Sequence, residues 1–262
     1  MTRILTIAKI VWLEMLRRKD LYVLLILMAV FLAAMLGLNI FGLGGLVAYV
    51  KEIGLLLLWI GTWVLTINFS ARQLPREEAT GTIFPLLAKP VTRGQFLLGK
   101  WLGAWGAGLA ASALFHLLLV GVVLARGSAL PWVTLAQHFL LHGCLLAILA
   151  AAGLMFSTRL HYDAAAALAY VFALGSFFVL PRVPQLVLHA RGLQHDLLLA
   201  LYFALPHLEL FDLRIRLAYD WGALAWPAFC AILAYGALVA ALLLVLAWLG
   251  YHRKNFPRSE RL

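Results

Sequence analysis

The sequence predicts an all-α membrane protein in which six helices cross the bilayer. Of its 262 residues, 65% are hydrophobic and only 12% are charged, a balance that the surface of a water-soluble domain could not carry. Continuous apolar runs recur along the chain, each close to the roughly 20 residues that a helix needs to cross about 30 Å of hydrocarbon. The runs lack the alternating pattern of transmembrane strands, which argues against a barrel.

Residues 1–20 are predicted to form an amphipathic helix in the inner membrane interface. Ile4, Ile7, Val11 and Met15 recur at helical spacing, and basic residues occupy the other faces and the C-terminal end. A plain cytoplasmic leader to the first crossing is the alternative. No removable signal is evident, because a short apolar run with a small-residue cleavage site is missing, so we expect the first crossing to act as the targeting signal.

Six segments are predicted to cross the membrane within a single transmembrane domain, residues 1–262. They are residues 21–41, 54–69, 96–124, 131–155, 164–180 and 227–251. The sixth is the clearest, because it opens with a proline, which favours a helix start, and contains no charge. In the third crossing, Gly99, Gly103, Ala107 and Ala111 recur every four residues. This spacing predicts the close approach of another helix, in the same chain or in a second copy.

Lys and Arg residues are distributed unequally between the two sides of the predicted membrane. With the N-terminus inside, 15 of the 21 fall on the cytoplasmic side and 6 on the outer side. Loops rich in Lys and Arg stay in the cytoplasm, so both termini and residues 71–95 are predicted to face the cytoplasm. The net charge of +10 is then a signature of topology and gives no support to nucleic-acid binding.

The extracytoplasmic segment, residues 181–226, is the longest part that is not expected to cross. Its middle is too apolar for a free loop, yet charged residues such as Arg191 and Asp196 argue against a seventh crossing. We expect one or two short helices, packed on the outer ends of the bundle or lying in the outer interface, with Pro206 as a break.

The sequence contains no motif that supports catalysis. A GxSxG elbow, an HExxH helix, a carboxylate pair and a cysteine cluster are all missing, so we expect this chain to be no enzyme and to hold no cofactor. Gly94, Gly99 and Lys100 have the spacing of a phosphate-binding loop. Trp101 stands where that loop needs Ser or Thr, which indicates a chance match.

Three histidines, His116, His138 and His142, supply the ionisable groups of the predicted membrane interior. His138 and His142 are one helical turn apart, so both could project from one face and bind a soft metal or relay a proton. We favour hydrogen bonding between helices, because a two-ligand pair is a weak metal signal. A membrane-embedded enzyme or metal site that uses all three histidines is the alternative.

Residues 71–95 are predicted to form a compact cytoplasmic module. Glu77 and Glu78 favour the start of a helix, and two prolines prevent a long uniform helix. A short apolar surface follows, flanked by basic residues: Ile83, Phe84, Leu86 and Leu87, with Arg76, Lys89 and Arg93. Such a surface suits a docked cytoplasmic partner; the alternative is a re-entry that merely joins two crossings.

Several short motifs follow one another in this module and at the mouth of the third crossing. They comprise Glu77 or Glu78, Gly81, Thr82, Leu86, Leu87, Pro90, Val91, Thr92, Arg93, Gly99 and Lys100. Their order resembles the first cytoplasmic loop of the ABC-2 family of export permeases. In that family a Glu precedes Gly-Thr, and a Leu-Leu pair, Pro-Val-Ser/Thr-Arg and Gly-Lys follow.

Two other segments carry the resemblance beyond this loop. The opening stretch WLEMLRRKDLYVL, with Glu14 and the basic run 17–19, is similar to the family's interfacial helix. The outer stretch LPHLELFDL, residues 205–213, resembles a subgroup that includes the permease serving copper-site maturation of nitrous oxide reductase.

The resemblance implies a permease subunit of an ABC exporter in the cytoplasmic (inner) membrane, surrounded by lipids. It implies a second copy, identical or related, and a separate cytoplasmic ATPase that binds ATP and Mg. Residues 76–93 would act as the coupling helix, with Arg76, Glu77, Glu78, Gly81, Thr82, Leu86, Leu87, Pro90 and Arg93 as its site residues. Substrate would pass between the two copies. The alternative is a complex that moves no substrate and acts mechanically on an extracytoplasmic partner through residues 181–226.

Overall fold

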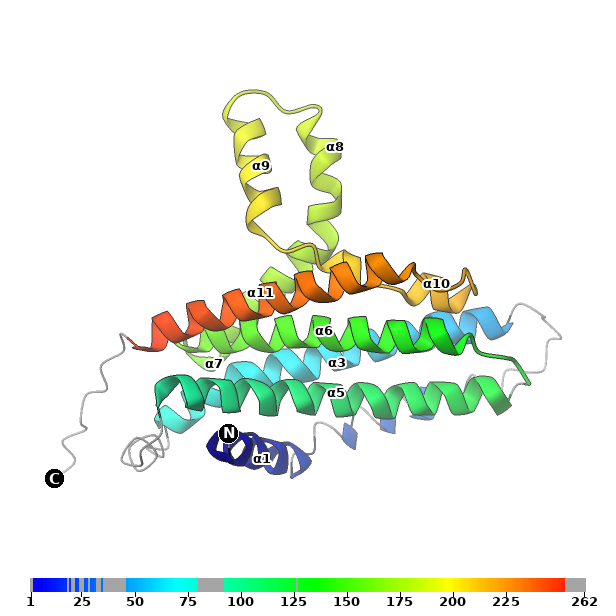
Figure 1. Cartoon of the computed structure of the whole chain (residues 1–262), viewed down its shortest axis with the longest axis horizontal. Helices are drawn as coiled ribbons and strands as arrows, with labels where there is room; N and C mark the ends of the chain where they lie inside the picture. Colours follow the sequence, from blue (N-terminus) through cyan, green and yellow to red (C-terminus); the bar gives the residue numbers. More distant parts are fainter. Residues whose placement is uncertain are drawn as a thin grey trace.

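The described part of the chain is almost entirely helical, and its long helices run side by side along one axis (Figure 1). This computed structural model describes residues 2–17, 46–79, 92–125 and 127–252, and isolated positions between 19 and 34. Within those residues there is no strand. The all-α prediction is therefore confirmed for the part of the chain that the structure describes.

The described elements follow one another in the order α1, α3, α5, α6, α7, η2, η3, α8, α9, η4, α10 and α11. Their bounds are α1 Thr2–Leu16, α3 Leu46–Ala79, α5 Arg93–Ala125, α6 Trp132–Ser157, α7 Tyr162–Leu174, the π-helical turn η2 Gly175–Val179, the 3₁₀ turn η3 Leu180–Arg182, α8 Val183–Val187, α9 Leu193–Ala204, the 3₁₀ turn η4 Leu208–Phe211, α10 Arg214–Ala218 and α11 Trp226–His252. The four longest helices contain 26 to 34 residues, which corresponds to about 39–51 Å at 1.5 Å per residue.

Five described helical segments are long and apolar enough to cross a membrane. They are Val47–Ala79, Arg93–Ala125, Trp132–Ser157, Tyr162–Val187 and Trp226–His252, and they agree with the second to sixth predicted crossings. The first predicted crossing, residues 21–41, lies largely outside the described residues and stays a prediction. The second is longer than predicted, because α3 passes Pro75 and keeps Ala71 and Leu74 buried.

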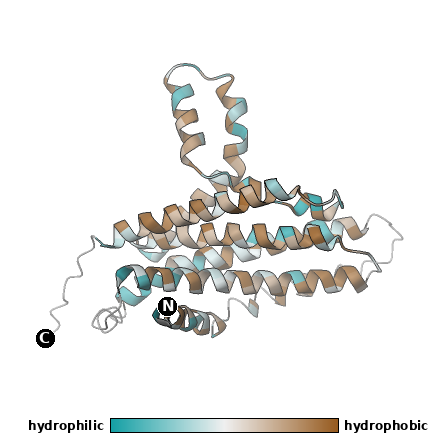
Figure 2. Ribbon diagram, viewed as in Figure 1, coloured by the Kyte–Doolittle hydropathy of each residue, from teal (hydrophilic) through white to brown (hydrophobic). Residues whose placement is uncertain are grey.

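Helix α6 lies at the centre of the bundle. It contacts α3, α5, α7 and α11, and its side chains are buried almost without interruption from Leu141 to Leu154. Hydrophobic residues cover most of the bundle, and hydrophilic ones are more frequent towards its two ends (Figure 2). Close van der Waals packing against α6 therefore helps to hold these four helices together.

The N-terminal helix α1 packs along α5. Ile7, Val11 and Met15 are buried, and a Cβ atom built on Gly103 would lie 2.5 Å from the Cβ of Val11. The small-residue stripe of α5 therefore receives a helix of the same chain. The predicted N-terminal helix is present, and its location in the membrane interface stays a prediction.

The outer segment has two parts with different packing. Helices α8 and α9 form a hairpin that projects sideways from the bundle (Figure 1), and no residue of α9 is buried. After the expected break near Pro206, η4 and α10 return to the bundle, where Leu208 and Phe211 of η4 are buried. Short helices are thus found in residues 181–226, and their location on the outer side of the membrane stays a prediction.

Candidate coupling site

The loop that carries the family-like motifs connects α3 to α5 at one end of the bundle, which we call the junction end. Helix α3 ends at Ala79 and α5 begins at Arg93. Thr92 and Gln95 form a reciprocal cap: the Gln95 amide donates to Thr92 Oγ1 at 3.2 Å, and the Thr92 amide donates to Gln95 Oε1 at 3.3 Å. This cap satisfies amide groups that the first turn of α5 would otherwise leave without partners.

Lys100 joins α5 to α3 just inside this end. Its side chain is 4% exposed and forms a salt bridge with Glu77, whose side chain is 17% exposed. The Lys100 ammonium also donates to Gln73 Oε1 at 3.1 Å and lies 5.7 Å from the ring centroid of Phe96. A buried ammonium needs such partners, because leaving water without compensation is very unfavourable. The pair therefore ties the two stems of the loop together.

Arg76 makes a second connection, from α3 to α1. Its guanidinium forms a salt bridge with Glu14, and the two side chains are 59% and 28% exposed. Exposed ion pairs contribute little free energy. This pair orients α1 relative to α3 more than it stabilises the fold.

Arg93 connects the first turn of α5 to the last turn of α11. Its Nη1 donates to the carbonyl oxygens of Tyr251 at 3.0 Å and His252 at 2.7 Å. The terminal carbonyls of a helix lack partners within the helix and carry partial negative charge. The guanidinium therefore acts as a cap for α11 supplied by α5.

The structure describes four of the nine predicted site residues, namely Arg76, Glu77, Glu78 and Arg93. Gly81, Thr82, Leu86, Leu87 and Pro90 lie outside the described residues. The expectation that Glu77 and Glu78 begin a helix was wrong: they lie near the end of α3, which continues because Ala71 and Leu74 still pack against the bundle. Sequence reasoning also missed Gln73 as a partner of Lys100.

A profile of ABC-2 family transporter proteins matches residues 5–253. The chain belongs to the ABC-2 transporter family. A comparison with curated proteins found no significant match. Membership identifies a multi-pass membrane protein of the kind that serves as the membrane subunit of an ABC transporter, and such membrane subunits are generally not catalytic.

The ABC-2 motif contains two residues that meet in this structure. The motif's Gly-Lys ends at Lys100, and its Glu could be Glu77 or Glu78. Of these two acidic residues, Glu77 is the one that forms a salt bridge with Lys100. The motif's Lys100 and one of its two candidate glutamates thus form a contact between α3 and α5.

The three histidines of this ABC-2 chain come together between α5 and α6. Ring centroids of His116, His138 and His142 lie 5.3, 5.9 and 6.4 Å apart. His142 Nε2 lies 2.8 Å from Thr62 Oγ1 of α3, an interhelical hydrogen bond of the predicted kind, and His116 Nδ1 donates to the Ser112 carbonyl at 2.7 Å. Neither ring nitrogen of His138 has a hydrogen-bond partner. Within the described ranges, no group of three or more His, Cys, Asp or Glu residues is arranged to hold a metal ion.

Proposed function

We propose that this chain is the permease subunit of an ABC exporter and that the loop between α3 and α5 couples it to a separate cytoplasmic ATPase. Membership of the ABC-2 family supports the membrane subunit. The network at the junction end supports the coupling role, because α3 and α5, the two helices that flank the loop, are joined through side chains to each other and to α1 and α11. Glu77–Lys100 joins α3 to α5, Arg76–Glu14 joins α3 to α1, and Arg93 joins α5 to α11.

Such a network suits mechanical coupling. A displacement of residues 80–91 acts on α3 and α5 directly, and the salt bridge between them resists movement of one stem without the other. The bonds to α1 and α11 pass the movement to the two sides of α5. In this proposal ATP and Mg bind to the ATPase, the permease forms a dimer with an identical or related copy in the cytoplasmic membrane, and substrate crosses between the copies.

The projecting hairpin supports one other function, mechanical work on an extracytoplasmic partner without transport. Leu188, Leu193 and Phe203 are 82%, 76% and 79% exposed, and the hairpin extends away from the bundle (Figure 1). A flux assay in reconstituted vesicles separates the two functions, because a mechanical complex hydrolyses ATP without flux.

The coupling proposal predicts that Glu78→Lys weakens binding of the ATPase while leaving the permease folded. Glu78 is partly exposed in the last turn of α3, so charge reversal alters the surface beside the loop. Glu77 is less suitable, because reversing its charge would place a cation against Lys100. We expect about a tenfold loss of affinity, the effect of roughly 1.4 kcal/mol at a charged interface.

The measurement is the amount of ATPase that co-purifies with the permease when the two are co-expressed, together with permease-stimulated ATP hydrolysis. The ATPase is the one whose reading frame lies nearest to that of the permease. Asp196→Lys is the control, because Asp196 is exposed in the first turn of α9 and makes the same change of charge on the projecting hairpin. Equal loss in both variants, or no loss in either, would contradict the proposal.

A further inference from the structure

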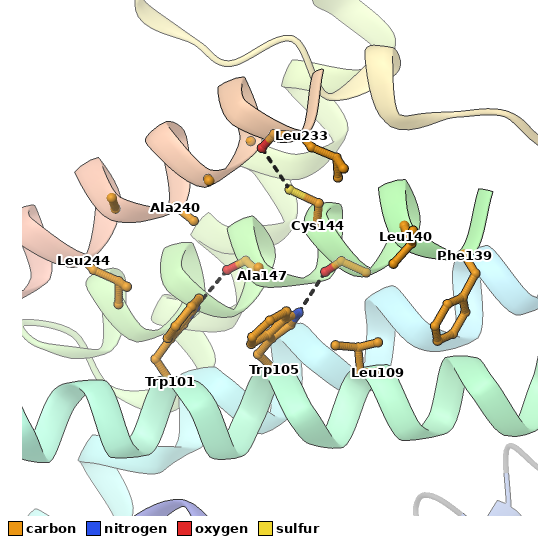
Figure 3. Close-up of a pocket in the computed structure, with 14 residues that line it drawn as sticks. Trp101, Trp105, Leu109, Phe139, Leu140, Cys144, Ala147, Leu233, Ala240 and Leu244 are labelled. Carbon is orange, nitrogen blue, oxygen red and sulfur yellow. Dashed lines mark hydrogen bonds between the residues drawn. The ribbon is translucent and has the colours of Figure 1, made fainter. Parts of the chain in front are cut away.

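A groove between α5, α6 and α11 runs along the membrane-spanning part of the bundle (Figure 3). Its larger section has a volume of about 530 Å³, and a second section, between Gly94 of α5 and Trp248 of α11, has about 370 Å³. Ala241 and Leu244 of α11 line both sections. The two sections therefore adjoin along α11.

The walls of this groove suit a hydrocarbon ligand. Trp101 and Trp105 project from α5 towards α6 (Figure 3), where their indole nitrogens donate to the carbonyl oxygens of Ala147 at 3.0 Å and Gly143 at 2.8 Å. Both indole donors are thus used within the protein, and the rest of the lining is almost entirely apolar. A polar ligand would lose its hydration here without gaining hydrogen bonds, whereas a hydrocarbon chain gains dispersion contacts with the rings.

The length of the groove indicates an extended chain. Its lining runs from Gly94 to Leu109 on α5 and from Leu233 to Trp248 on α11, which is about 22 Å along each helix at 1.5 Å per residue. That exceeds half of the roughly 30 Å hydrocarbon core of a bilayer. A lipid tail that enters at the junction end could follow the groove past the middle of the membrane.

The junction end of the groove has the residues that accompany lipid head groups. Trp248 lines the groove there, and Arg93, which donates to the last carbonyls of α11, directly precedes Gly94 of the lining. Tryptophan is enriched at membrane interfaces, and basic residues attract the anionic lipids of the cytoplasmic leaflet. The predicted topology places this end in the cytoplasm. Charge complementarity therefore favours a lipid with an anionic head group.

We propose that the groove binds one acyl chain of an anionic phospholipid of the inner leaflet, with the phosphate beside Arg93. The lipid would fill the space between α5 and α11 and follow relative movements of these two helices. Because Arg93 also caps α11, the head group would lie next to the junction network.

Photocrosslinking in nanodiscs tests this site. The full chain is placed in three parts phosphatidylcholine to one part phosphatidylglycerol, with a diazirine in the acyl chain of the phosphatidylglycerol, and labelled peptides are identified by mass spectrometry. We expect labels on the groove faces of α5 and α11. Replacing Ala237 and Ala241 with Phe should lower the labelling about fivefold, because both alanines are exposed, line the groove and leave space that the rings would fill.

Ala231→Phe is the matched control, since Ala231 is exposed on α11 but does not line the groove, and it should label as the parent does. Excess unlabelled phosphatidylglycerol should compete with the probe and prevent labelling of the unmodified chain. Excess phosphatidylcholine should not. This comparison needs no variant. Labelling that survives filling of the groove would overturn the proposal. Equal competition by the two lipids would also overturn it. So would a groove-filled variant that no longer dimerises but is still labelled by the lipid, because the groove would then bind the second copy.

Discussion

Replacing Lys100 with Met is expected to destabilise the folded chain by about 3 kcal/mol, because it leaves the largely buried Glu77 carboxylate without its cation. Methionine keeps most of the apolar stem, so the change removes mainly the ammonium group, with its contacts to Glu77, Gln73 and the Phe96 ring. Thermal unfolding of the purified protein in detergent measures the effect. We expect the melting temperature to fall by about 6–12 °C for a chain of this size.

Three variants test the physical cause. Glu77→Gln combined with Lys100→Met removes both charges and should recover most of the lost stability, since no uncompensated ion remains. The exchange Glu77→Lys with Lys100→Glu should also be more stable than Lys100→Met. Arg76→Met removes the exposed pair with Glu14 and should cost only about 0–1 kcal/mol. Equal effects of Lys100→Met and Arg76→Met would show that burial of the pair is not the cause.

The all-helical class and the later crossings could be predicted because a bilayer forces each crossing to satisfy its own backbone hydrogen bonds. The ends of the helices were harder to predict from the sequence. The second predicted crossing, residues 54–69, excluded Lys51 and Arg72, yet both lie within α3, Leu46–Ala79. Lys51 donates to Asp220 at 3.1 Å and Arg72 to the Tyr162 hydroxyl at 2.7 Å. These partners are distant in sequence, so the predicted segment was too short at both ends.

In the candidate site too, contacts within one helix could be predicted from the sequence, whereas contacts between helices could not. The spacing of His138 and His142 predicts a shared helix face correctly, because one turn of α6 determines it. His116 of α5 lies beside His138, and Lys100 of α5 lies beside Glu77. Both contacts depend on how α5 packs against its neighbours. Resemblance to the ABC-2 family placed Lys100 and either Glu77 or Glu78 in one motif, and the structure shows the salt bridge between Lys100 and Glu77.

Gly103→Ala is expected to destabilise the protein by about 1–3 kcal/mol, the usual range for an overpacked contact. The added Cβ would lie 2.5 Å from the Cβ of Val11 and 3.1 Å from the carbonyl oxygen of Ala8, so α1 must move away from α5. Helix propensity acts in the opposite direction, since Ala favours a helix interior over Gly by about 1 kcal/mol. A net loss of stability therefore requires the contact with α1, and thermal unfolding measures it.

Gly106→Ala is the control that isolates this contact. Gly106 lies on the same helix, but a Cβ built on it meets nothing within 4 Å, so the variant should keep or slightly raise the melting temperature. Gly103→Ala should cost less in a Val11→Gly background than in the parent, because the clashing Cβ is gone, although the contact with Ala8 remains. The clash also predicts weaker ATPase binding in Gly103→Ala, because α1 carries Glu14, the partner of Arg76 at the junction end. Normal binding with displaced α1 would show that α1 is dispensable for coupling, and that α3, α5 and α11 transmit the movement without it.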